Sequence, residues 1–411
     1  MKKSLLKKYA NLIVRIGANV QPGQHVLITA AAEQHDFVTL VVEECYKAKA
    51  KGVRVKWYHQ PIEKLGYKKM SLKTLSTVPK YRLEEYQWIV DNLPCMIHIE
   101  SDDPDGLNGI DQDKVQKAEV ATYPLFKPYI DKLEDLTHQW VIAAVPSVKW
   151  AKKVFPELGK KQAVEALWKA IFQTVRVSED NDPIQAWREH NETFIKRAKW
   201  LNDHNFDYLT YKSSNGTDFR CELIKEGMWH GGKDQTKGGR DFNPNLPTEE
   251  IYTSPMKGKC EGKLVATKPL SARGSLIKDF WIEFVDGKAT NWDAKEGKEV
   301  LEKIITSDEG SRMLGELALI PANSPINNQN ILYYSTLFDE NACCHVALGR
   351  GFLDCIKGFH ERSLEECQKL GINDSMVHVD FMIGSDDLEI IGYKDGQPTQ
   401  IFKDGNWAFE V

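Results

Sequence analysis

A strand, a helix and a second strand near the start of the chain restrict its fold more than any other feature. Residues 25–31 (HVLITAA) form a short apolar run, and residues 52–58 (GVRVKWY) alternate as a strand does. Residues 37–50, between them, repeat apolar side chains with helical spacing. This order predicts a β-α-β unit, in which two parallel strands are joined by a right-handed crossover.

Two further apolar segments extend this pattern, at residues 95–100 (CMIHIE) and 139–145 (QWVIAAV). Long helical stretches separate the strands, so an open parallel α/β sheet is expected. Such sheets often bind nucleotides, but the turn after the first strand, TAAAEQHD, contains no glycine. A dinucleotide fingerprint needs glycines for close approach to the pyrophosphate, and no G-x-x-x-x-G-K-[ST] loop occurs either. We therefore expect no nucleotide cofactor.

The pattern changes after a long, polar-faced helix predicted at residues 184–205. Short β-type segments punctuated by glycine turns follow, and one helix is predicted among them at residues 296–314. The β-type segments are residues 208–211, 218–223, 264–267, 276–284, 331–338 and 378–383. A chain of 411 residues is too long for one ordinary core. We expect an α/β domain at residues 1–183 and an α+β catalytic domain, rich in antiparallel strands, at residues 184–411, with residues 184–205 as connecting helix.

Composition narrows the class of protein. Apolar residues make up 42% and charged residues 27%, values of a globular protein. The net charge of −5 and the scattered lysines give no basic surface for nucleic acid. Apolar runs such as residues 140–146 are too short to cross a bilayer, and the N-terminus has no apolar block of a signal peptide. A cytoplasmic protein without membrane or nucleic-acid partners is expected, its eight cysteines being buried free thiols.

Three carboxylates in the second half are candidates for chemistry. Glu249 and Glu250 are adjacent in NPNLPTEEI, and on an extended chain their side chains point in opposite directions. One could bind a metal while the other meets a water, or Thr248 could cap a helix that starts here. Glu316 lies in the apolar segment GELALIP, where an ionised carboxylate is costly unless it is paired or metal-bound. Alternatively, it lies at the mouth of the strand in water.

Two histidines and an aspartate complete the candidate set. His345 is embedded in small and apolar residues (NACCHVALG), which suits either a core histidine or a ligand. His378 and Asp380 stand two apart in HVDFMIG, so a strand would place both on one face. This is suitable metal geometry, although a hydrogen-bonded pair without metal has the same spacing. Together, Glu250, Glu316 and these three residues match the nitrogen and oxygen ligands of paired divalent metals.

The same segments carry a resemblance. NPNLPTEEIYTSP, GELALIP, NACCHVALG and HVDFMIGS are similar, in order and spacing, to the aminopeptidase T / aminopeptidase S family of dinuclear metallo-aminopeptidases, and the likeness covers essentially the whole chain. The resemblance implies two divalent metal ions per subunit (zinc, cobalt or manganese). It also implies a homodimer that releases N-terminal residues from short peptides. The ligands it implies are Glu250, Glu316, His345, His378 and Asp380.

The resemblance leaves two catalytic groups to be identified. Other two-metal aminopeptidases use a carboxylate next to a ligand as general base, so by analogy Glu249 is our candidate. The family commonly carries a tyrosine seven residues after the metal-binding histidine, but Phe352 stands at that position and has no hydroxyl. Tyr252 is a possible substitute. The alternative reading is a metal-binding homologue whose turnover is weak or altered because of Phe352.

Overall fold

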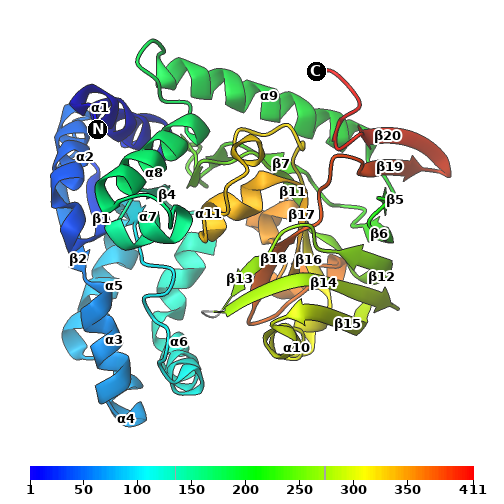
Figure 1. Ribbon diagram of the computed structural model, residues 1–411, viewed down its shortest axis with the longest axis horizontal. Coiled ribbons are helices and arrows are strands. Elements are labelled where there is room, and N and C mark those ends of the chain that lie inside the picture. The colour runs from blue at the N-terminus through cyan, green and yellow to red at the C-terminus, as the bar shows by residue number, and fades with distance from the viewer. Residues whose placement is uncertain (135, 273–274) are drawn as a thin grey trace. The chain divides into compact units, whose positions relative to one another are not determined.

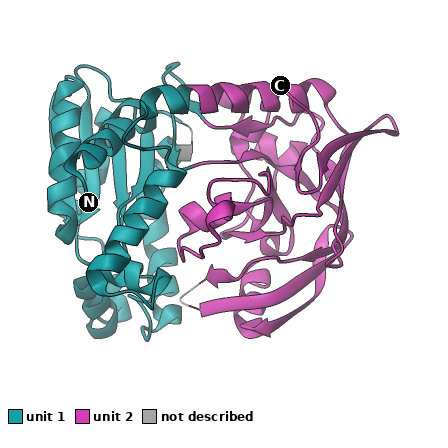
Figure 2. Cartoon of the chain, turned by 45° about the horizontal axis from the view of Figure 1, so that its top comes forward, with its two compact units in different colours: residues 1–188, 233–247 teal, residues 189–232, 248–411 magenta. Residues whose placement is uncertain are grey.

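The computed structural model describes residues 1–134, 136–272 and 275–411, which form two compact units. Unit 1 comprises residues 1–188 and 233–247, and unit 2 comprises residues 189–232 and 248–411 (Figure 2). Helix α9 (Pro183–His204), predicted as the connector, spans the change from one unit to the other. Figure 1 labels the elements named below.

Unit 1 contains the predicted parallel sheet. Its strands follow the order β10-β4-β3-β1-β2, and every pairing between them is parallel. They are β1 (His25–Ala31), β2 (Gly52–Tyr58), β3 (Cys95–Glu100), β4 (Trp140–Ala144) and β10 (Asn245–Leu246). The open parallel α/β sheet expected from the sequence is confirmed.

Helices precede and connect the strands of this sheet. They are α1 (Lys3–Leu12), α2 (His35–Lys47), α3 (Gln60–Lys69), α4 (Leu72–Leu75), α5 (Lys80–Asn92), α6 (Gln112–Glu134), α7 (Val148–Val154) and α8 (Lys160–Thr174). An aromatic cluster joins three of them: Tyr9 of α1 lies 5.6 Å from Phe37 of α2 and 5.9 Å from Phe172 of α8, between ring centroids. These apolar contacts stabilise the helical layer of unit 1.

Residues 233–247 return to unit 1 after the chain has entered unit 2. They form β8 (Asp234–Gln235), β9 (Asp241–Phe242) and β10, which adds a short parallel pair to β4. The sequence analysis placed this stretch in the second domain, because a pairing of two residues leaves no pattern in the sequence. The segment that begins at Thr248 and carries the candidate residues Glu249 and Glu250 therefore directly follows residues that belong to unit 1.

Unit 2 is built from antiparallel strands, as expected. One sheet has the order β13-β14-β12-β6-β5-β19-β20-β21, with β15 beside β14. Its strands are β5 (Tyr208–Lys212), β6 (Asp218–Leu223), β12 (Pro255–Val265), β13 (Leu270–Ala272), β14 (Ser275–Val285), β15 (Lys288–Glu296), β19 (Glu389–Lys394), β20 (Gln397–Lys403) and β21 (Asn406–Trp407). The antiparallel-rich second half is thereby confirmed.

The second sheet of unit 2 has the order β18-β17-β16-β11-β7. Its strands are β7 (His230–Gly231), β11 (Ile251–Thr253), β16 (Leu314–Leu319), β17 (His345–Gly349) and β18 (His378–Met382). Three further helices belong to unit 2: α10 (Lys298–Ile305), α11 (Thr336–Asp339) and α12 (Leu364–Leu370). All the candidate metal ligands lie on or next to this second sheet.

Three predicted elements of unit 2 differ from the structure. The strand predicted at residues 331–338 is a loop that ends in α11, because its apolar side chains are buried without strand pairing. The helix predicted at 296–314 ends at Ile305, and Leu314 already begins β16. The segment at 264–267 is only the end of the much longer β12, whose first half carries the lysines and glycines of a solvated strand.

Two expectations about the whole chain can also be compared with the structure. All eight cysteines are free and buried, as predicted. Among the described residues, no helix has both the length and the apolar character needed to cross a bilayer.

Candidate metal centre

Strand alternation in the second sheet of unit 2 sorts the candidate residues onto one face. Glu316 of β16 pairs with Ala347 of β17, which in turn pairs with Asp380 of β18. Directly opposed residues of antiparallel strands share a face. His345 is two residues from Ala347, and His378 is two residues from Asp380, so both histidines lie on the face of the carboxylates.

Glu250 reaches the same face from β11. Tyr252 pairs with Ala318, and Ala318 pairs with His345. Glu250 precedes Tyr252 by two residues. Because alternate residues of an extended chain point to the same side, the side chain of Glu250 points to the side of His345. Residues 248–250 form no helix and lead directly into β11, so the alternative of a helix capped by Thr248 is wrong.

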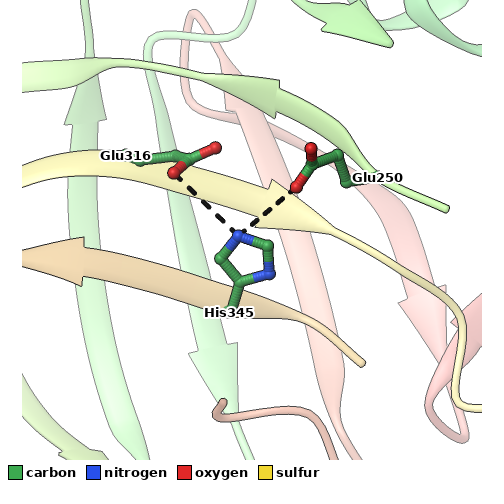
Figure 3. Close-up of side chains that lie close together, drawn as sticks. All are labelled: Glu250, Glu316 and His345. Atoms are coloured by element: carbon green, nitrogen blue, oxygen red, sulfur yellow. Dashed lines mark ion pairs between the residues drawn. The ribbon is translucent and has the colours of Figure 1, made fainter. Parts of the chain in front are cut away.

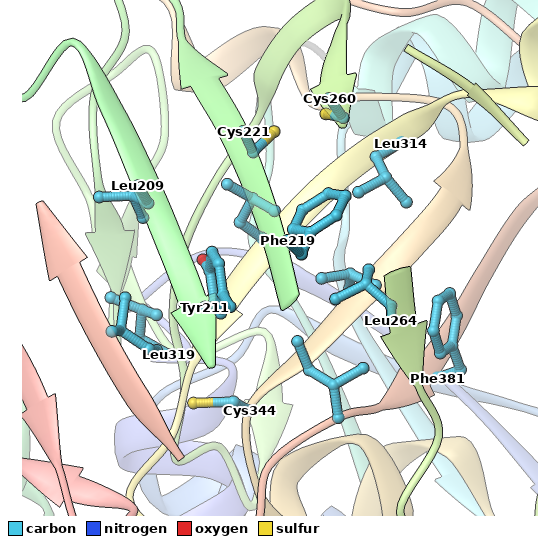
Figure 4. Close-up of a cluster of buried hydrophobic side chains, with 14 of the residues drawn as sticks. Leu209, Tyr211, Phe219, Cys221, Cys260, Leu264, Leu314, Leu319, Cys344 and Phe381 are labelled. Carbon is cyan, nitrogen blue, oxygen red and sulfur yellow. The ribbon is translucent and has the colours of Figure 1, made fainter. Parts of the chain in front are cut away.

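The opposite face of this sheet fixes it in the unit. Its side chains belong to the main hydrophobic core, part of which is drawn in Figure 4. They include Ile251, Leu317, Leu319, Val346, Leu348 and Phe381. Phe381 packs against Phe280 of β14, with ring centroids 5.6 Å apart, which joins the two sheets. The side chains behind the polar face are therefore fully buried in the hydrophobic core.

The five side chains form two groups of possible ligands. Figure 3 shows the first, in which the Nε2 atom of His345 lies 3.5 Å from Oε2 of Glu250 and 3.9 Å from Oε2 of Glu316. In the second group, Nε2 of His378 lies 3.2 Å from both Oε2 of Glu316 and Oδ1 of Asp380. Glu316 belongs to both groups. The structure thus brings together all five residues predicted as ligands.

These separations suit a common cation. Nitrogen and oxygen ligands lie about 2.0–2.2 Å from zinc, so the edges of a tetrahedron of such ligands are about 3.3–3.6 Å. The donor chemistry also fits, because carboxylates and imidazoles are ligands of divalent transition metals. Among the described residues, Glu316 and Asp380 form ion pairs with His345 and His378 alone, so no lysine or arginine neutralises them.

A backbone carbonyl orients one of the histidines. Nδ1 of His378 donates a hydrogen bond of 2.7 Å to the carbonyl oxygen of Arg350, which leaves Nε2 facing the carboxylates. Such a contact fixes the tautomer and the ring direction of a metal-binding histidine. The Nδ1 atom of His345 is buried and meets no hydrogen-bond partner among the described residues. Packing therefore holds His345, whereas a hydrogen bond holds His378.

A β-bulge gives Glu316 its direction. The register of β16 against β17 shifts between Leu314 and Glu316, so Gly315 is the extra residue. A Cβ atom at Gly315 would lie 2.2 Å from the carbonyl oxygen of Arg350, which only glycine avoids. The same carbonyl accepts the hydrogen bond from His378, so the bulge positions two of the candidate ligands at once.

The charges and the burial of these groups shift their pKa values. Burial raises the pKa of Glu316, although the hydrogen bond from His378 opposes this. Burial would lower the pKa of His378, but the charges of Asp380 and Glu316 raise it well above its usual range. Burial would raise the pKa of Asp380, yet His378 lowers it to about 2. The two carboxylates beside His378 therefore favour a positive charge at this position.

Glu249 belongs to neither ligand group. Its carboxylate is buried, and Oε2 lies 3.7 Å from Nε2 of His190 on α9. Arg197 of the same helix is close enough to interact with its charge. The backbone N–H of Glu249 donates a hydrogen bond of 2.8 Å to Oδ1 of Asn341. Its role as general base stays a prediction.

The two aromatic residues singled out in the sequence flank the cluster. The ring of Phe352 lies 4.8 Å from the ring of His378 and 5.5 Å from that of Tyr252, between centroids. The hydroxyl of Tyr252 donates a hydrogen bond of 2.9 Å to Oδ2 of Asp354. The position of the expected tyrosine therefore borders the candidate ligands, and the hydroxyl of Tyr252 is engaged by a carboxylate.

The sequence analysis missed one acidic residue near the cluster. Glu340 precedes the segment that carries His345, and burial together with repulsion from Asp380, Glu250 and Glu316 raises its pKa well above the usual range. Asp339 and Glu340 form an acidic pair between apolar segments, which is the signal that could have drawn attention to it.

Comparison with known proteins agrees with this centre. The family model described as thermophilic metalloprotease (M29) matches residues 2–407. The chain belongs to this M29 metalloprotease family. Family membership makes it a metal-dependent peptidase and implies a divalent metal cofactor.

Individual relatives match along nearly the whole chain. Aminopeptidase AmpS of Bacillus subtilis (strain 168) is 38% identical over 405 residues, which cover 98% of each chain. Aminopeptidase T of Thermus aquaticus is 36% identical over 412 residues, with 98% of each chain covered. The solved structure of wild-type AmpT from Thermus thermophilus has a TM-score of 0.91 at 35% identity, covering 99% of this chain and 100% of that one.

Proposed function

We propose that this protein is an aminopeptidase that releases N-terminal residues from short peptides, using two divalent cations per subunit. The observation that carries the proposal is the pair of ligand groups that share Glu316 on one face of a buried sheet. Glu250 and His345 would hold one cation, His378 and Asp380 the other, and Glu316 would bridge them. The relatives named aminopeptidases support the same substrate class.

Bound cations would supply a water of lowered pKa and an electrophile for the scissile carbonyl. The chain's own residues do the positioning. Core packing of the opposite strand face holds the carboxylates, and the carbonyl of Arg350 keeps Nε2 of His378 directed at them. A preorganised arrangement of this kind needs no rearrangement during the reaction.

Glu249 is the proposed general base. It adjoins Glu250 in sequence, it is buried, and the nearby His190 could accept or return a proton. The competing role is structural, since Glu249 also joins β11 to α9. Glu249→Gln keeps the size of the side chain and its ability to accept a hydrogen bond. We expect unchanged metal content with kcat lowered by about 100-fold or more, as for loss of a general base. Unchanged turnover would remove Glu249 from the mechanism.

The principal experiment is metal analysis combined with an assay. The purified protein is chelated and then reloaded with Zn²⁺, Co²⁺ or Mn²⁺, and release of N-terminal residues from leucine p-nitroanilide and short peptides is followed. We expect two ions per chain, loss of activity on chelation and recovery on reloading. A reloaded protein that cleaves no peptide contradicts the proposal. The metal with the highest activity identifies the preferred ion.

A metal-binding homologue with weak or altered turnover is the second candidate. The observation in its favour is Phe352, whose ring borders His378 and offers no hydroxyl to a developing oxyanion. This candidate predicts normal metal binding with very low kcat on every peptide tested. We further propose a cytoplasmic homodimer, and light scattering after gel filtration tests the dimer.

A further inference from the structure

Helix α3 of unit 1 exposes an apolar stripe together with lysines. Ile62 is 66% exposed and Leu65 is 58% exposed, and no side chain of α3 is buried. Ile62, Leu65 and Lys69 stand at i, i+3 and i+7, so they share one face of the helix, and all three are exposed. A helix of a globular protein usually turns its apolar stripe toward the core. An exposed stripe is instead typical of an interaction surface.

The segment that follows α3 extends this surface. Met70 is 47% exposed and Leu72 is 39% exposed. The Cε atom of Met70 lies 3.7 Å from the position that a Cβ atom on Gly66 would take, and Gly66 follows Ile62 by one helical turn, so Met70 adjoins the apolar stripe. Figure 1 shows α3 and α4 in succession at one end of unit 1. We name these side chains the α3–α4 surface: Ile62, Leu65, Met70 and Leu72, with Lys68, Lys69 and Lys73.

The charge of this region is opposite to that of the whole chain. Residues 60–82 carry a net charge of +5 and contain a single acidic residue, Glu63, whereas the whole chain carries −5. Lys68, Lys69 and Lys73 are exposed, and among the described residues none of the three forms an ion pair. The α3–α4 surface therefore combines exposed aliphatic side chains with positive charges that the chain itself does not neutralise.

We propose that the α3–α4 surface binds an anionic lipid bilayer, with its apolar side chains inserted among the acyl chains and its lysines at the headgroups. Lysine suits such a surface, because its methylene stem lies along apolar groups while its ammonium group stays in water. Anionic lipids attract this basic region and repel the acidic remainder of the chain, so the same charges orient the protein. The sequence analysis expected no membrane partner because no segment could cross a bilayer, but a peripheral surface needs no such segment.

The composition of the surface favours a bilayer over a second protein or a nucleic acid. The core of a protein–protein interface is rich in aromatic residues and arginine and poor in lysine. Arg82 is the one arginine of residues 60–82, and its guanidinium group lies 5.7 Å from the centroid of the Phe126 ring, so it packs against α6. Single-stranded nucleic acid stacks its bases on aromatic side chains, which the α3–α4 surface lacks. Aliphatic residues flanked by lysines match the boundary between headgroups and acyl chains.

Sedimentation with sucrose-loaded vesicles tests the proposal. One set of vesicles contains phosphatidylglycerol in phosphatidylcholine, and the other contains phosphatidylcholine alone. We expect the wild type to bind only the first set, and to bind it much less at about 1 M NaCl than at about 0.1 M, because salt screens exposed charges. The combined variant Lys68→Gln, Lys69→Gln and Lys73→Gln should bind about 100-fold more weakly, since each lysine near an anionic bilayer contributes about fivefold.

Two further variants separate insertion from charge. Ile62→Ser combined with Leu65→Ser keeps every charge, and we expect binding to anionic vesicles to be weaker by about 10-fold or more, because two apolar side chains no longer insert. The combination of Lys212→Gln, Lys259→Gln and Lys403→Gln removes the same charge from exposed positions of unit 2 and should leave binding unchanged. All the replaced side chains are exposed, so the thermal unfolding midpoint of each variant should equal that of the wild type.

Absence of wild-type binding to anionic vesicles, equal binding to both sets of vesicles, or unchanged binding of the lysine variant or the serine variant would each overturn the inference. An equal loss of binding in the unit 2 control would do so as well. A wild type that self-associates or binds a labelled oligonucleotide through Lys68, Lys69 and Lys73, without binding vesicles, would assign the surface to a second copy of this chain or to nucleic acid and would also overturn it. Peptide hydrolysis plays no part in this assay, so its outcome is independent of the proposed function.

Discussion

Replacement of the shared carboxylate provides the strongest test of the proposed centre. Glu316→Gln retains the shape of the side chain but removes the one negative charge that belongs to both ligand groups. Glu250→Gln and Asp380→Asn each remove a charge from one group only. We therefore expect Glu316→Gln to impair both cation sites, whereas each of the other two variants retains one.

The size of the effect follows from mass action. A cation at 100 times its dissociation constant stabilises the folded protein by about 2.7 kcal/mol, so two sites contribute about 5.4 kcal/mol. Unit 2 has roughly 200 residues, for which each kcal/mol shifts Tm by about 2–4 °C. Loading should thus raise the Tm of the wild type by about 11–22 °C and that of each single-site variant by about half as much.

For Glu316→Gln, the increase in Tm on metal loading should nearly vanish. Loss of a residue that merely supports a ligand weakens metal binding by about 10- to 100-fold, and loss of a ligand should cost at least the upper value. A cation then present at its dissociation constant contributes only about 0.4 kcal/mol per site, or about 1–2 °C.

The assay is differential scanning calorimetry with and without metal, accompanied by elemental analysis. Glu249 is a buried carboxylate outside both groups, so Glu249→Gln is the matched control. Metal loading should raise its Tm as much as that of the wild type. If Glu316→Gln bound one ion per chain with unchanged affinity, Glu316 could not be the shared ligand, and the two-cation arrangement would have to be abandoned.

Three further predictions concern single positions. Phe352→Tyr adds a hydroxyl beside His378, so we expect kcat on leucine p-nitroanilide to rise by about 10-fold or more, and an unchanged kcat would show that the position is not limiting. Gly315→Ala forces a Cβ atom against the carbonyl of Arg350, so metal content and Tm should both fall; a normally loaded variant would contradict the role of the bulge. Burial lowers the pKa of His138 from 6.5 to about 4, so the stability that its neutral form provides is complete above pH 6.5 and is lost as pH falls toward 4. From pH 7 to pH 5 this amounts to about 2 kcal/mol, and His138→Leu should lose correspondingly less stability in urea unfolding; an equal loss in both proteins would contradict it.

The sequence identified the elements whose side-chain pattern is determined locally. The strands at residues 25–31 and 95–100 agree with the structure, because buried parallel strands are rich in apolar residues. The strand at residues 52–58 lies at the edge of the sheet and was recognised from its alternation. His378 and Asp380 were assigned correctly to one face of a strand, because residues two apart in a strand point to the same side whatever their neighbours are.

Features that depend on distant residues could not be predicted from the sequence. Asn245 and Leu246 complete the sheet of unit 1 through two residues only, which no periodicity reveals. Tyr333, Leu337 and Phe338 suggested a strand, since burial in a loop and burial in a strand require the same apolar residues. The contact that directs His378 comes from a backbone carbonyl, which any residue at position 350 would supply.

Small side chains on the polar face of this sheet leave room for the candidate ligands. Ala347 lies between Glu316 and Asp380, and Ala318 lies between Tyr252 and His345, in neighbouring strands. A larger side chain at either position would occupy the space toward which the carboxylates and imidazoles converge. The opposite face carries leucine, valine and phenylalanine in the core. Alternate residues of these strands therefore have different roles. The side chains on one face are buried in the core and fix the backbone, whereas small side chains on the other face leave space for the charged donors. A chain that lost the ligands but kept this alternation would retain the fold without the chemistry.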